Sequence, residues 1–456
     1  MSDAPGILEP PRAFWGILRS IGPGLILTAN IVGTGELIVT TRLGSRVGFD
    51  LLWFIVLGCF IKVFVQVELG RYTVSEGVGS LEILDRLPGP RRRVSWAVWF
   101  WMLMYVGTLC QMAAMIGGIA ELFAGSASPG AYAAWVIACA ALTAIMLAVG
   151  RYGLVERLST FMVVGFTLSS ILAVGFLQGT ASRVSGSDLV RGLSLGLPAD
   201  LVTAFAAFGI TGVGAAELMF YPIWCLEKGY ARAVGPRDGS PQWEARARGW
   251  LRVMRWDAWL SMAVYTVGTV CFYLLGAAIL NRQGRVVDDL QPMTTLSEMY
   301  TQTYGPAQGW WIFFVGAFTV LYSTYFVSAA SNARLFADAG GLLGVFRSAR
   351  PADRARIIRF AVVGIPVFTA ALILLAGPRI TTLILVGGTA QALMLPFLGF
   401  AALWFGRRVA PSIRGGGAWT AALVVAFVLM SSLGLFQAQS ETARLWNRLF
   451  PATSQR

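Results

Sequence analysis

The sequence predicts an all-α membrane protein, and three observations lead to that fold class. Of the 456 residues, 56% are hydrophobic and 13% are charged, whereas a soluble domain has about 45–50% apolar residues. The mean hydropathy is +0.66. Apolar stretches of about 20 residues, the length that crosses a bilayer as a helix, recur along the chain. We count eleven of them, at residues 14–46, 50–70, 94–123, 131–150, 153–178, 200–227, 253–280, 308–333, 357–377, 380–406 and 417–437.

Two of these stretches are broken by glycines that lie close to an acidic residue. Residues 28–37 read TANIVGTGEL and residues 209–218 read GITGVGAAEL, so Glu36 and Glu217 each follow a glycine-rich break. A charged group at the bilayer centre costs about 2.5–3.5 kcal/mol, and such residues usually face a cavity and serve a function. Paired broken helices in the two halves of a membrane protein indicate the substrate site of a transporter. We therefore expect the first and sixth helices to be broken around one polar site.

The position of the breaks also predicts how the chain is organised. Because the breaks fall in the first and sixth stretches, they fit an inverted repeat of five plus five helices with one helix added. Residues 14–178 would form the first repeat, residues 200–406 the second and residues 417–437 the extra helix. All would belong to a single transmembrane transporter domain over residues 1–456.

The basic residues are distributed as in a membrane protein rather than a nucleic-acid-binding one. The chain carries 36 Lys and Arg against 23 Asp and Glu, a net charge of +13. If the N-terminus is cytoplasmic, 25 of the basic residues fall in cytoplasmic segments and ten in external ones, as the positive-inside rule requires. We therefore predict a multi-pass protein of the cell membrane, surrounded by the lipid bilayer, with a cytoplasmic N-terminus and an external C-terminus. No nucleic acid partner is implied.

Several classes of chemistry are excluded by residues that are absent or isolated. The chain has no histidine, which removes the commonest metal ligand and the usual proton carrier near neutral pH. Its five cysteines lie in apolar runs without paired spacing, so we interpret them as small hydrophobic residues. No nucleophile, base and orienting group occur at a recognisable spacing. We expect neither an enzyme nor a bound cofactor.

The broken stretches supply the main candidate site residues. Glycine lets the chain leave helical geometry around Gly33 and Thr34 and around Gly212, which frees carbonyls that coordinate a cation and amides that bind an anion. Glu36 and Glu217 would line the site between the breaks. An alternative is that Glu36 only caps the outer half-helix and balances its dipole, a contribution of about 0.3–1 kcal/mol. Glycine pairs are also common where membrane helices pack.

The second stretch contributes two further polar candidates. Lys62 lies deep in this stretch, and Gln66 follows one turn later on the same face. Lys62 either reaches the membrane surface or has a buried partner, and we expect it to be the counter-ion of Glu36 or Glu217 when the site is empty. Its ammonium would repel a divalent metal ion. For the other polar residues within the stretches we expect hydrogen bonds between helices: Gln111, Asp257, Tyr322, Ser323, Thr324 and Gln391.

Short motifs resemble the Nramp family of divalent-metal transporters. Residues 22–24 (GPG), followed by the break and then by residues 48–53 (GFDLLW), resemble the beginning of these transporters. Gln66 stands where the family has a glutamine in its second helix. Residues 255–257 (RWD) are similar to the opening of its seventh helix and residues 391–396 (QALMLP) to its tenth. The resemblance covers nearly the whole chain, and it implies the LeuT-type fold, alternating access and, by analogy with the fold, a monomer.

The departures from the family pattern fall on the binding residues. The family's metal-site Asp, Asn, Met and His align, in that order, with Gly33, Glu36, Ala215 and Glu217, and its proton-pathway acids with Gln111 and Ala114. The thioether ligand and the proton route are therefore replaced, although Met219 could supply a displaced thioether. The carbonyl ligand of the sixth helix would be that of Gly212. Hard oxygen ligands favour Mg²⁺, Mn²⁺ or Ca²⁺ over softer metals.

The sequence thus predicts a secondary transporter or uniporter that moves a divalent metal cation, Mg²⁺ or Mn²⁺, without the family's proton pathway. The predicted metal ligands and supporting residues are Glu36, Glu217, the carbonyls of Gly33 and Gly212, and then Gln66 and Gln391. The alternative is a carrier of a small organic cation or zwitterion, such as an amine or an amino acid. Its ammonium would meet the glutamates, and half-helix N-termini or Lys62 would hold any carboxylate. A third hypothesis is a receptor that has the same fold but does not transport.

Overall fold

The computed structural model describes residues 6–33, 35–125, 128–149, 152–196, 208, 211–287, 292–346, 351–377 and 379–449, without the side chains of residues 437, 438 and 440–449. Within these residues the chain is almost entirely helical, which confirms the predicted all-α class. The strands β1 (Arg91–Arg92) and β2 (Val94–Ser95) pair as a short antiparallel hairpin. The helices are α1 (Phe14–Ser20), α2 (Pro23–Ile31), η1 (Gly35–Thr40), α3 (Thr41–Val47), α4 (Leu52–Glu76), α5 (Ser80–Asp85), α6 (Trp96–Ala124), α7 (Pro129–Ala148), α8 (Tyr152–Leu177), α9 (Gly186–Gly192), α11 (Ala215–Lys228), α12 (Tyr230–Val234), α13 (Pro241–Leu275), η2 (Gly276–Leu280), η3 (Asn281–Gln283), α14 (Pro292–Tyr304), α15 (Pro306–Leu342), α16 (Pro351–Ala376), α17 (Ile380–Gly406), η4 (Pro411–Ile413) and α18 (Gly417–Leu449).

Nine helices within the described residues are long and apolar enough to cross a membrane: α4, α6, α7, α8, α13 with η2 and η3, α15, α16, α17 and α18. A tenth candidate is the pair Pro23–Ile31 and Gly35–Val47, which is bent by 45°. This bend is the break predicted in the first helix. Much of the first half of the sixth stretch, residues 200–207, 209 and 210, lies outside the described residues, and its second half is α11. The described residues therefore do not establish the predicted count of eleven.

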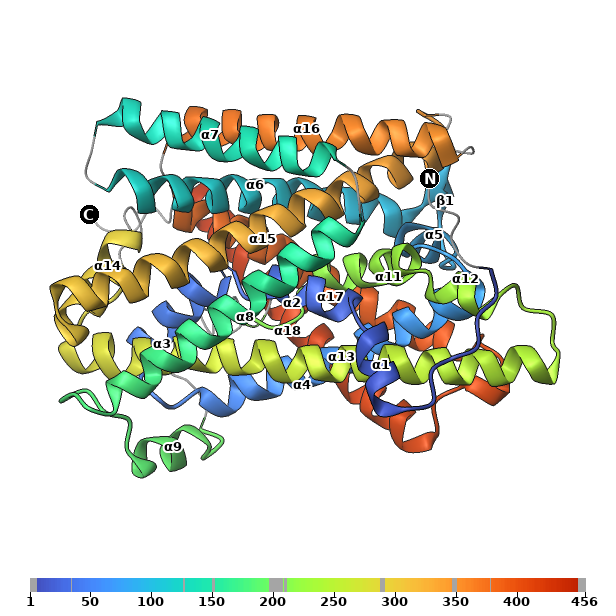
Figure 1. Ribbon diagram of the computed structural model, residues 1–456, viewed down its shortest axis with the longest axis horizontal. Helices are drawn as coiled ribbons and strands as arrows, with labels where there is room; N and C mark the ends of the chain where they lie inside the picture. The colour runs from blue at the N-terminus through green and yellow to red at the C-terminus, as the bar shows by residue number, and fades with distance from the viewer. Residues whose placement is uncertain are drawn as a thin grey trace.

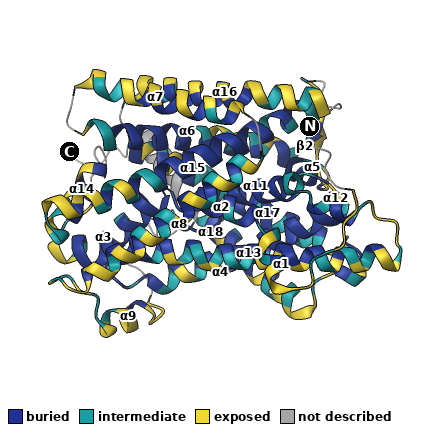
Figure 2. Ribbon diagram, viewed as in Figure 1, coloured by how far each residue is buried: buried dark blue, intermediate teal, exposed yellow. Residues whose placement is uncertain are grey.

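The long helices form a bundle around the short helices of the two breaks. In Figure 1, α7 and α16 lie side by side along one edge of the bundle, where they contact each other. Helix α6 packs on α17, α8 on α15 and α4 on α13, while α2 and α11 contact each other near the centre. Figure 2 shows the centre buried and the outer sides of α7 and α16 exposed. Exposed apolar side chains such as Phe161, Phe360 and Leu375 suit an environment of lipid.

The start of α2 is fixed by an acid of α13. Pro23 occupies the first turn of α2, where its missing N–H leaves no bond unmade. The amides of Gly22 and Gly24 donate to the two carboxylate oxygens of Asp257, at 2.9 and 2.6 Å, and so use donors that a helix N-terminus leaves free. Asp257 Oδ2 also accepts from the hydroxyl of Tyr221 on α11, at 3.1 Å. Asp257 thus connects α2, α11 and α13.

Helix α18 is attached to α4 through a buried ion pair. Arg71 donates to both carboxylate oxygens of Glu68, at 3.0 and 2.7 Å, within α4. The indole N–H of Trp419, on α18, donates to Glu68 Oε2 at 2.7 Å, and the guanidinium of Arg71 lies 5.3 Å from the Trp419 ring centroid. Because a buried charge is costly unless it is paired and hydrogen-bonded, these contacts make the position of α18 specific.

Candidate functional site

Glu36 connects the two breaks. It lies in the first turn of η1 and is fully buried. Its Oε2 atom accepts from the amide of Gly33 at 3.2 Å, and its Oε1 atom accepts from the amide of Gly212 at 3.1 Å. Gly212 has a φ of +66°, a conformation that glycine adopts without a steric penalty. One carboxylate therefore binds backbone amides from both broken stretches.

Glu217 is held by a chain of side-chain hydrogen bonds. It lies in the first turn of α11, and its Oε1 atom accepts from the side-chain amide of Asn30 at 2.6 Å. The Asn30 carbonyl oxygen accepts in turn from the hydroxyl of Ser328 on α15, at 2.6 Å. Hydrogen bonds to a charged group are shorter and stronger than neutral ones. This chain fixes the carboxylate against α2 and α15.

Two glutamines approach the start of α11 from other helices. Gln391 on α17 accepts through Oε1 from the backbone amide of Ala216 at 3.1 Å, and donates through Nε2 to Gln111 Oε1 on α6 at 2.7 Å. Amide oxygens satisfy donors at a helix N-terminus as carboxylates do, but without a charge. The pair therefore adds neutral oxygen ligands beside Glu217.

Gly33 is required by the close approach of α15. The Thr324 hydroxyl lies 3.3 Å from the carbonyl oxygens of both Ala29 and Val32 and 2.9 Å from that of Val320. A Cβ atom on Gly33 would lie 2.1 Å from Thr324 Oγ1. No larger residue fits without displacing α15. Thr324 therefore faces the carbonyls that the first break exposes.

These side chains enclose a small cavity between the breaks. Its lining is formed by Asn30, Ile31, Gly33, Gly35, Glu36, Gln111, Met115, Glu217, Thr324 and Gln391. The cavity has a volume of about 10 Å³, which is roughly the space that one water molecule requires. Among the described residues there is no group of three or more His, Cys, Asp and Glu that could hold a metal ion. A cation here would therefore need amide, hydroxyl or carbonyl oxygens besides the two carboxylates.

The structure places four of the predicted site residues around this cavity: Gly33, Glu36, Glu217 and Gln391. Gly212 meets the site through its amide, which donates to Glu36. Lys62 and Gln66 do not line the cavity, and Gln66 is buried with no hydrogen-bond partner for its side chain within the described residues. Thr34 lies outside the described residues.

Lys62 has partners other than those predicted. Its ammonium donates to the carbonyl oxygens of Phe208 and Thr211 at 2.5 and 2.6 Å. Across the described part of the chain it forms no ion pair with Glu36 or Glu217, so the predicted direct counter-ion contact is not present. The reason is that the second break exposes carbonyl groups closer to the ammonium than either carboxylate.

Sequence reasoning missed three polar or sulfur-containing side chains at the site: Asn30 and Met115, which line the cavity, and Ser328, which donates to Asn30. Asn30 had a signal, since it is an amide inside an apolar stretch, three residues before Gly33. Ser328 and Met115 had none, because small hydroxyls and thioethers are ordinary in membrane helices. Met219, a candidate source of a displaced thioether, does not line the cavity, and the thioether that does is that of Met115. The hydrogen bonds predicted between helices are present for Gln111, Asp257, Tyr322, Thr324 and Gln391. The Ser323 hydroxyl instead donates to the carbonyl of Val320 within α15.

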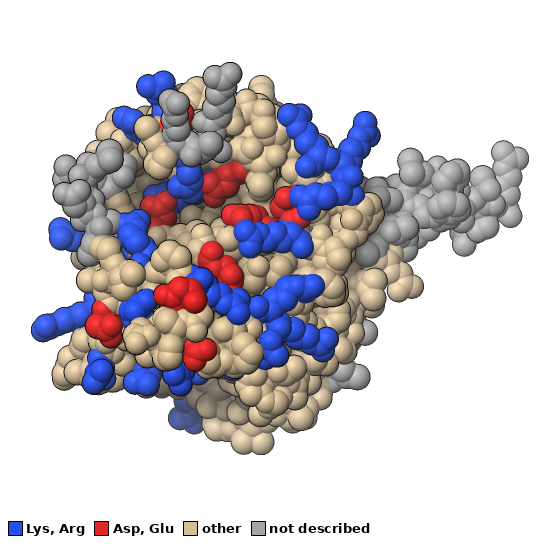
Figure 3. All heavy atoms as spheres, turned by 90° about the vertical axis from the view of Figure 1, so that its right-hand side faces the viewer, with Lys and Arg blue, Asp and Glu red and all other residues tan. Residues whose placement is uncertain are grey.

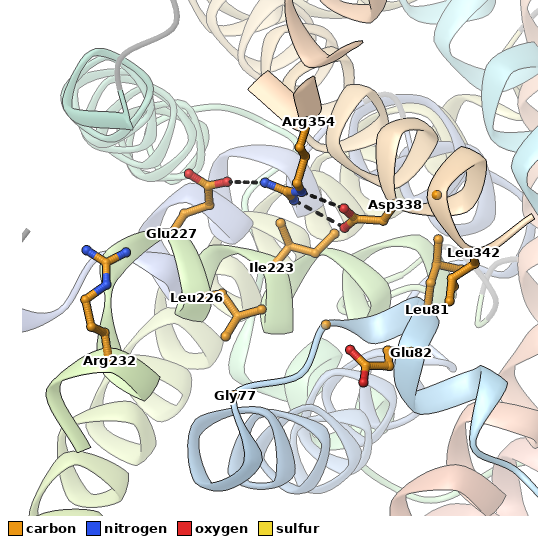
Figure 4. Close-up of a pocket in the computed structure, with 12 residues that line it drawn as sticks. Gly77, Leu81, Glu82, Ile223, Leu226, Glu227, Arg232, Asp338, Leu342 and Arg354 are labelled. Carbon is orange, nitrogen blue, oxygen red and sulfur yellow. Dashed lines mark hydrogen bonds and ion pairs between the residues drawn. The ribbon is translucent and has the colours of Figure 1, made fainter. Parts of the chain in front are cut away.

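A larger hollow lies at the other end of α11. Figure 3 shows Lys and Arg gathered on this face around a hollow that contains acidic side chains. The cavity here has a volume of about 600 Å³. In Figure 4, Arg354 of α16 points between Glu227 of α11 and Asp338 of α15, with N–O distances of 3.4 and 2.7 Å. We call this hollow the vestibule. Helix α11 thus runs from Glu217 at the small cavity to Glu227 at the vestibule.

Comparison with known proteins decides the family. A model of the natural resistance-associated macrophage protein-like (Nramp) family matches residues 24–437. The chain belongs to the Nramp family. Members of this family are metal ion transporters and not enzymes, and the chain is accordingly a multi-pass membrane protein, as the sequence predicted.

Individual relatives of this Nramp chain are distant. It is 25% identical over 292 residues to the divalent metal cation transporter MntH of Chromohalobacter salexigens, an alignment that covers 63% of this chain and 62% of that protein. It is 22% identical over 289 residues to MntH of Yersinia enterocolitica, covering 62% of this chain and 67% of that one. The chain therefore spans slightly less than two thirds of the length of the first of these relatives.

Solved structures share the fold of this Nramp chain. A manganese transporter of Eremococcus coleocola superposes with a TM-score of 0.70 at 15% identity, covering 100% of this chain and 93% of the other. MHP1, a nucleobase-cation-symport-1 family transporter, gives a TM-score of 0.59 at 16% identity, with 100% and 97% covered. At such identities the likeness establishes the fold, which is the predicted LeuT-type fold, and no ligand.

Proposed function

We propose that this Nramp chain transports a divalent metal cation, Mn²⁺ first and Mg²⁺ second, by alternating access through the cavity between the two breaks. The observation that supports it most is that Glu36 and Glu217, from different breaks, line one buried cavity the size of a water molecule. Two carboxylates in so small a space favour a compact cation. Family membership supports the same cargo.

The ligand chemistry supports Mn²⁺ or Mg²⁺ over softer metals. The side-chain oxygens around the cavity come from two carboxylates, three amides and one hydroxyl, with the thioether of Met115 as the single soft group in the described lining. Backbone carbonyls of Gly33 and Gly212 would complete the ligand set as the broken helices move. Because Mg²⁺ loses its water shell reluctantly, the small cavity favours Mn²⁺.

We also propose that transport proceeds without the family's proton pathway. Gln111 and Ala114 replace the acids of that pathway. The Gln111 side chain accepts a hydrogen bond from Gln391, and an amide does not exchange a proton at physiological pH as a carboxylate does. A secondary transporter without proton coupling, or a uniporter, follows from these two residues.

The helix contacts support the predicted inverted repeat. If residues 14–178 and 200–406 are equivalent, α6 corresponds to α15, α8 to α17, and α7 to α16. The contact between α6 and α17 then mirrors the contact between α15 and α8, and the α7–α16 contact mirrors itself. The basic face in Figure 3 supports a cytoplasmic location for the end that carries α1 and α12, and hence for the N-terminus.

A small organic cation or zwitterion is the second candidate cargo. The observation in its favour is the replacement of the family's Asp, Met and His by Gly33, Ala215 and Glu217. MHP1, which has the same fold, is described with bromovinylhydantoin bound, and one fold serves many substrates. The small cavity and the engagement of Lys62 with backbone carbonyls both favour the metal ion.

Uptake by liposomes that contain the purified chain tests the proposal. We expect Mn²⁺ to enter and quench a trapped metal-sensitive dye, and expect uptake to be lost in Glu36→Gln and in Glu217→Gln. Glu298→Gln is the matched control, since its side chain is half exposed and pairs with Arg285. Uptake of a labelled amine or amino acid without any response to Mn²⁺ would contradict metal transport and favour the second candidate.

A further inference from the structure

The Lys62 ammonium is bound by groups of the kind that would bind a free cation. Its side chain is fully buried in α4. The ammonium donates to the carbonyl oxygens of Phe208 and Thr211 at 2.5 and 2.6 Å, and it lies 4.3 Å from the centroid of the Phe208 ring. Carbonyl oxygens and an aromatic face are the groups that bind a free ammonium ion. Here the ammonium that these groups bind belongs to the side chain of Lys62.

The carbonyls that hold Lys62 belong to the second break. Thr211 immediately precedes Gly212, so the peptide group between them presents its carbonyl to the Lys62 ammonium and its N–H to the Glu36 carboxylate. The first break is different, because its exposed carbonyls of Ala29 and Val32 face the neutral hydroxyl of Thr324. Among the described residues, a fixed positive charge therefore lies at the second break and none at the first.

This charge acts on the site without touching it. The ammonium and the Glu36 carboxylate bind opposite ends of the Thr211–Gly212 peptide group, although within the described residues Lys62 forms an ion pair with neither glutamate. Inside a protein, interactions between such charges are weakly screened. Two ionised carboxylates alone give the site a charge of −2, and the ammonium reduces that charge to −1. A divalent ion that enters is consequently held less strongly than two carboxylates would hold it.

We propose that Lys62 acts as a built-in cation: its ammonium occupies the carbonyl site of the second break and weakens the binding of divalent ions, which favours their release. This inference rests on the proposed transport of a divalent cation. It assigns to Lys62 a positioning role towards the break and an electrostatic role towards the cargo. The two roles can be separated, because arginine retains the charge and methionine retains only the length.

The test measures Mn²⁺ binding by calorimetry and Mn²⁺ uptake in liposomes for the full chain, Lys62→Met and Lys62→Arg. We expect Lys62→Met to bind Mn²⁺ at least about tenfold more tightly, the effect of about 1.4 kcal/mol of lost repulsion, and to turn over more slowly. Lys62→Arg should keep the wild-type affinity. A purely structural lysine would give the opposite result, since its loss would weaken Mn²⁺ binding or leave it unchanged.

The outcomes separate this inference from the proposed function. If the wild type binds Mn²⁺ and Lys62→Met binds it no more tightly, the inference alone is wrong; if Lys62→Arg tightens binding equally, geometry and not charge is responsible and the inference is again wrong. If neither protein binds Mn²⁺, both proposals are wrong. Lys62→Gln, whose amide still donates to a carbonyl, is measured in parallel and gives the same comparison if Lys62→Met is not monodisperse.

Discussion

The two breaks of this chain satisfy their exposed backbone groups by different means. At the first break, the carbonyls of Ala29 and Val32 lie near a hydroxyl of α15. At the second, the carbonyls of Phe208 and Thr211 receive an ammonium from α4. The amides of the two breaks share one acceptor, Glu36. The amides of the two breaks are thus bound by the same carboxylate, whereas their exposed carbonyls have different partners.

The same comparison separates the two glutamates. Both oxygens of Glu36 accept from backbone amides, one from each break. Glu217 Oε1 instead accepts from the side chain of Asn30, which rearranges more easily than backbone. We infer that Glu36 mainly holds the breaks together, whereas Glu217 is the acid that meets the cargo. Substitutions that alter one break at a time test this division.

The largest effect is expected for Glu217→Gln. A hydrogen bond or contact to a charged group is worth about 1.5–3 kcal/mol, so the loss of this charge should weaken Mn²⁺ binding by about 100-fold. The glutamine carbonyl can still accept from Asn30, so the melting temperature should be unchanged. Calorimetry and a thermal-shift measurement on the purified protein check both values. A wild-type affinity would show that Glu217 is not a cargo ligand.

Glu36→Gln should act on stability as well as on binding. Glutamine offers one acceptor oxygen, so the amide of Gly33 or of Gly212 would lose its partner. A buried donor left unsatisfied costs about 1–3 kcal/mol. We therefore expect a lower melting temperature than for the wild type and for Glu217→Gln. Equal melting temperatures for the two variants would remove the distinction between the glutamates.

Ser328→Ala should have a moderate effect confined to binding. It removes the donor to Asn30 that orients the amide towards Glu217. A neutral hydrogen bond contributes about 1 kcal/mol, which corresponds to roughly fivefold weaker Mn²⁺ binding. Ser323→Ala is the control on the same helix, because the one bond of the Ser323 hydroxyl to the described residues is to the carbonyl of Val320 within α15. Similar losses in both variants would contradict a role for the Asn30 chain.

The sequence alone could predict the breaks and their acids but not how the acids are held. Glycines beside Glu36 and Glu217 in apolar stretches are local signals, and local signals are what a sequence displays. Ser328 contacts Asn30 across 298 positions of the chain, and nothing in either stretch indicates that α2 and α15 pack together. The ligand set of a site assembled from distant helices therefore needs the structure.

Lys62 shows the same limit from another side. Its burial could be predicted from its depth in an apolar stretch, and a partner was expected. The expected partner was a carboxylate, since charge is visible in a sequence. A freed backbone carbonyl is not visible, because every residue has one and only the break exposes it. The sequence therefore predicted an oxygen acceptor for Lys62, but placed it on a carboxylate, whereas the structure places it on backbone carbonyls.

The smallest effect is expected at the far end of α11, where Arg354 bridges Glu227 and Asp338 (Figure 4). The three side chains are about one quarter to one third exposed, and ion pairs near the surface contribute about 0–1 kcal/mol. Arg354→Gln should therefore change the initial rate of Mn²⁺ uptake by no more than about fivefold and leave the Mn²⁺ affinity unchanged. A tenfold or larger change in rate at constant affinity would mean that the vestibule end of α11, and not the pair of breaks, limits the movement of the cargo.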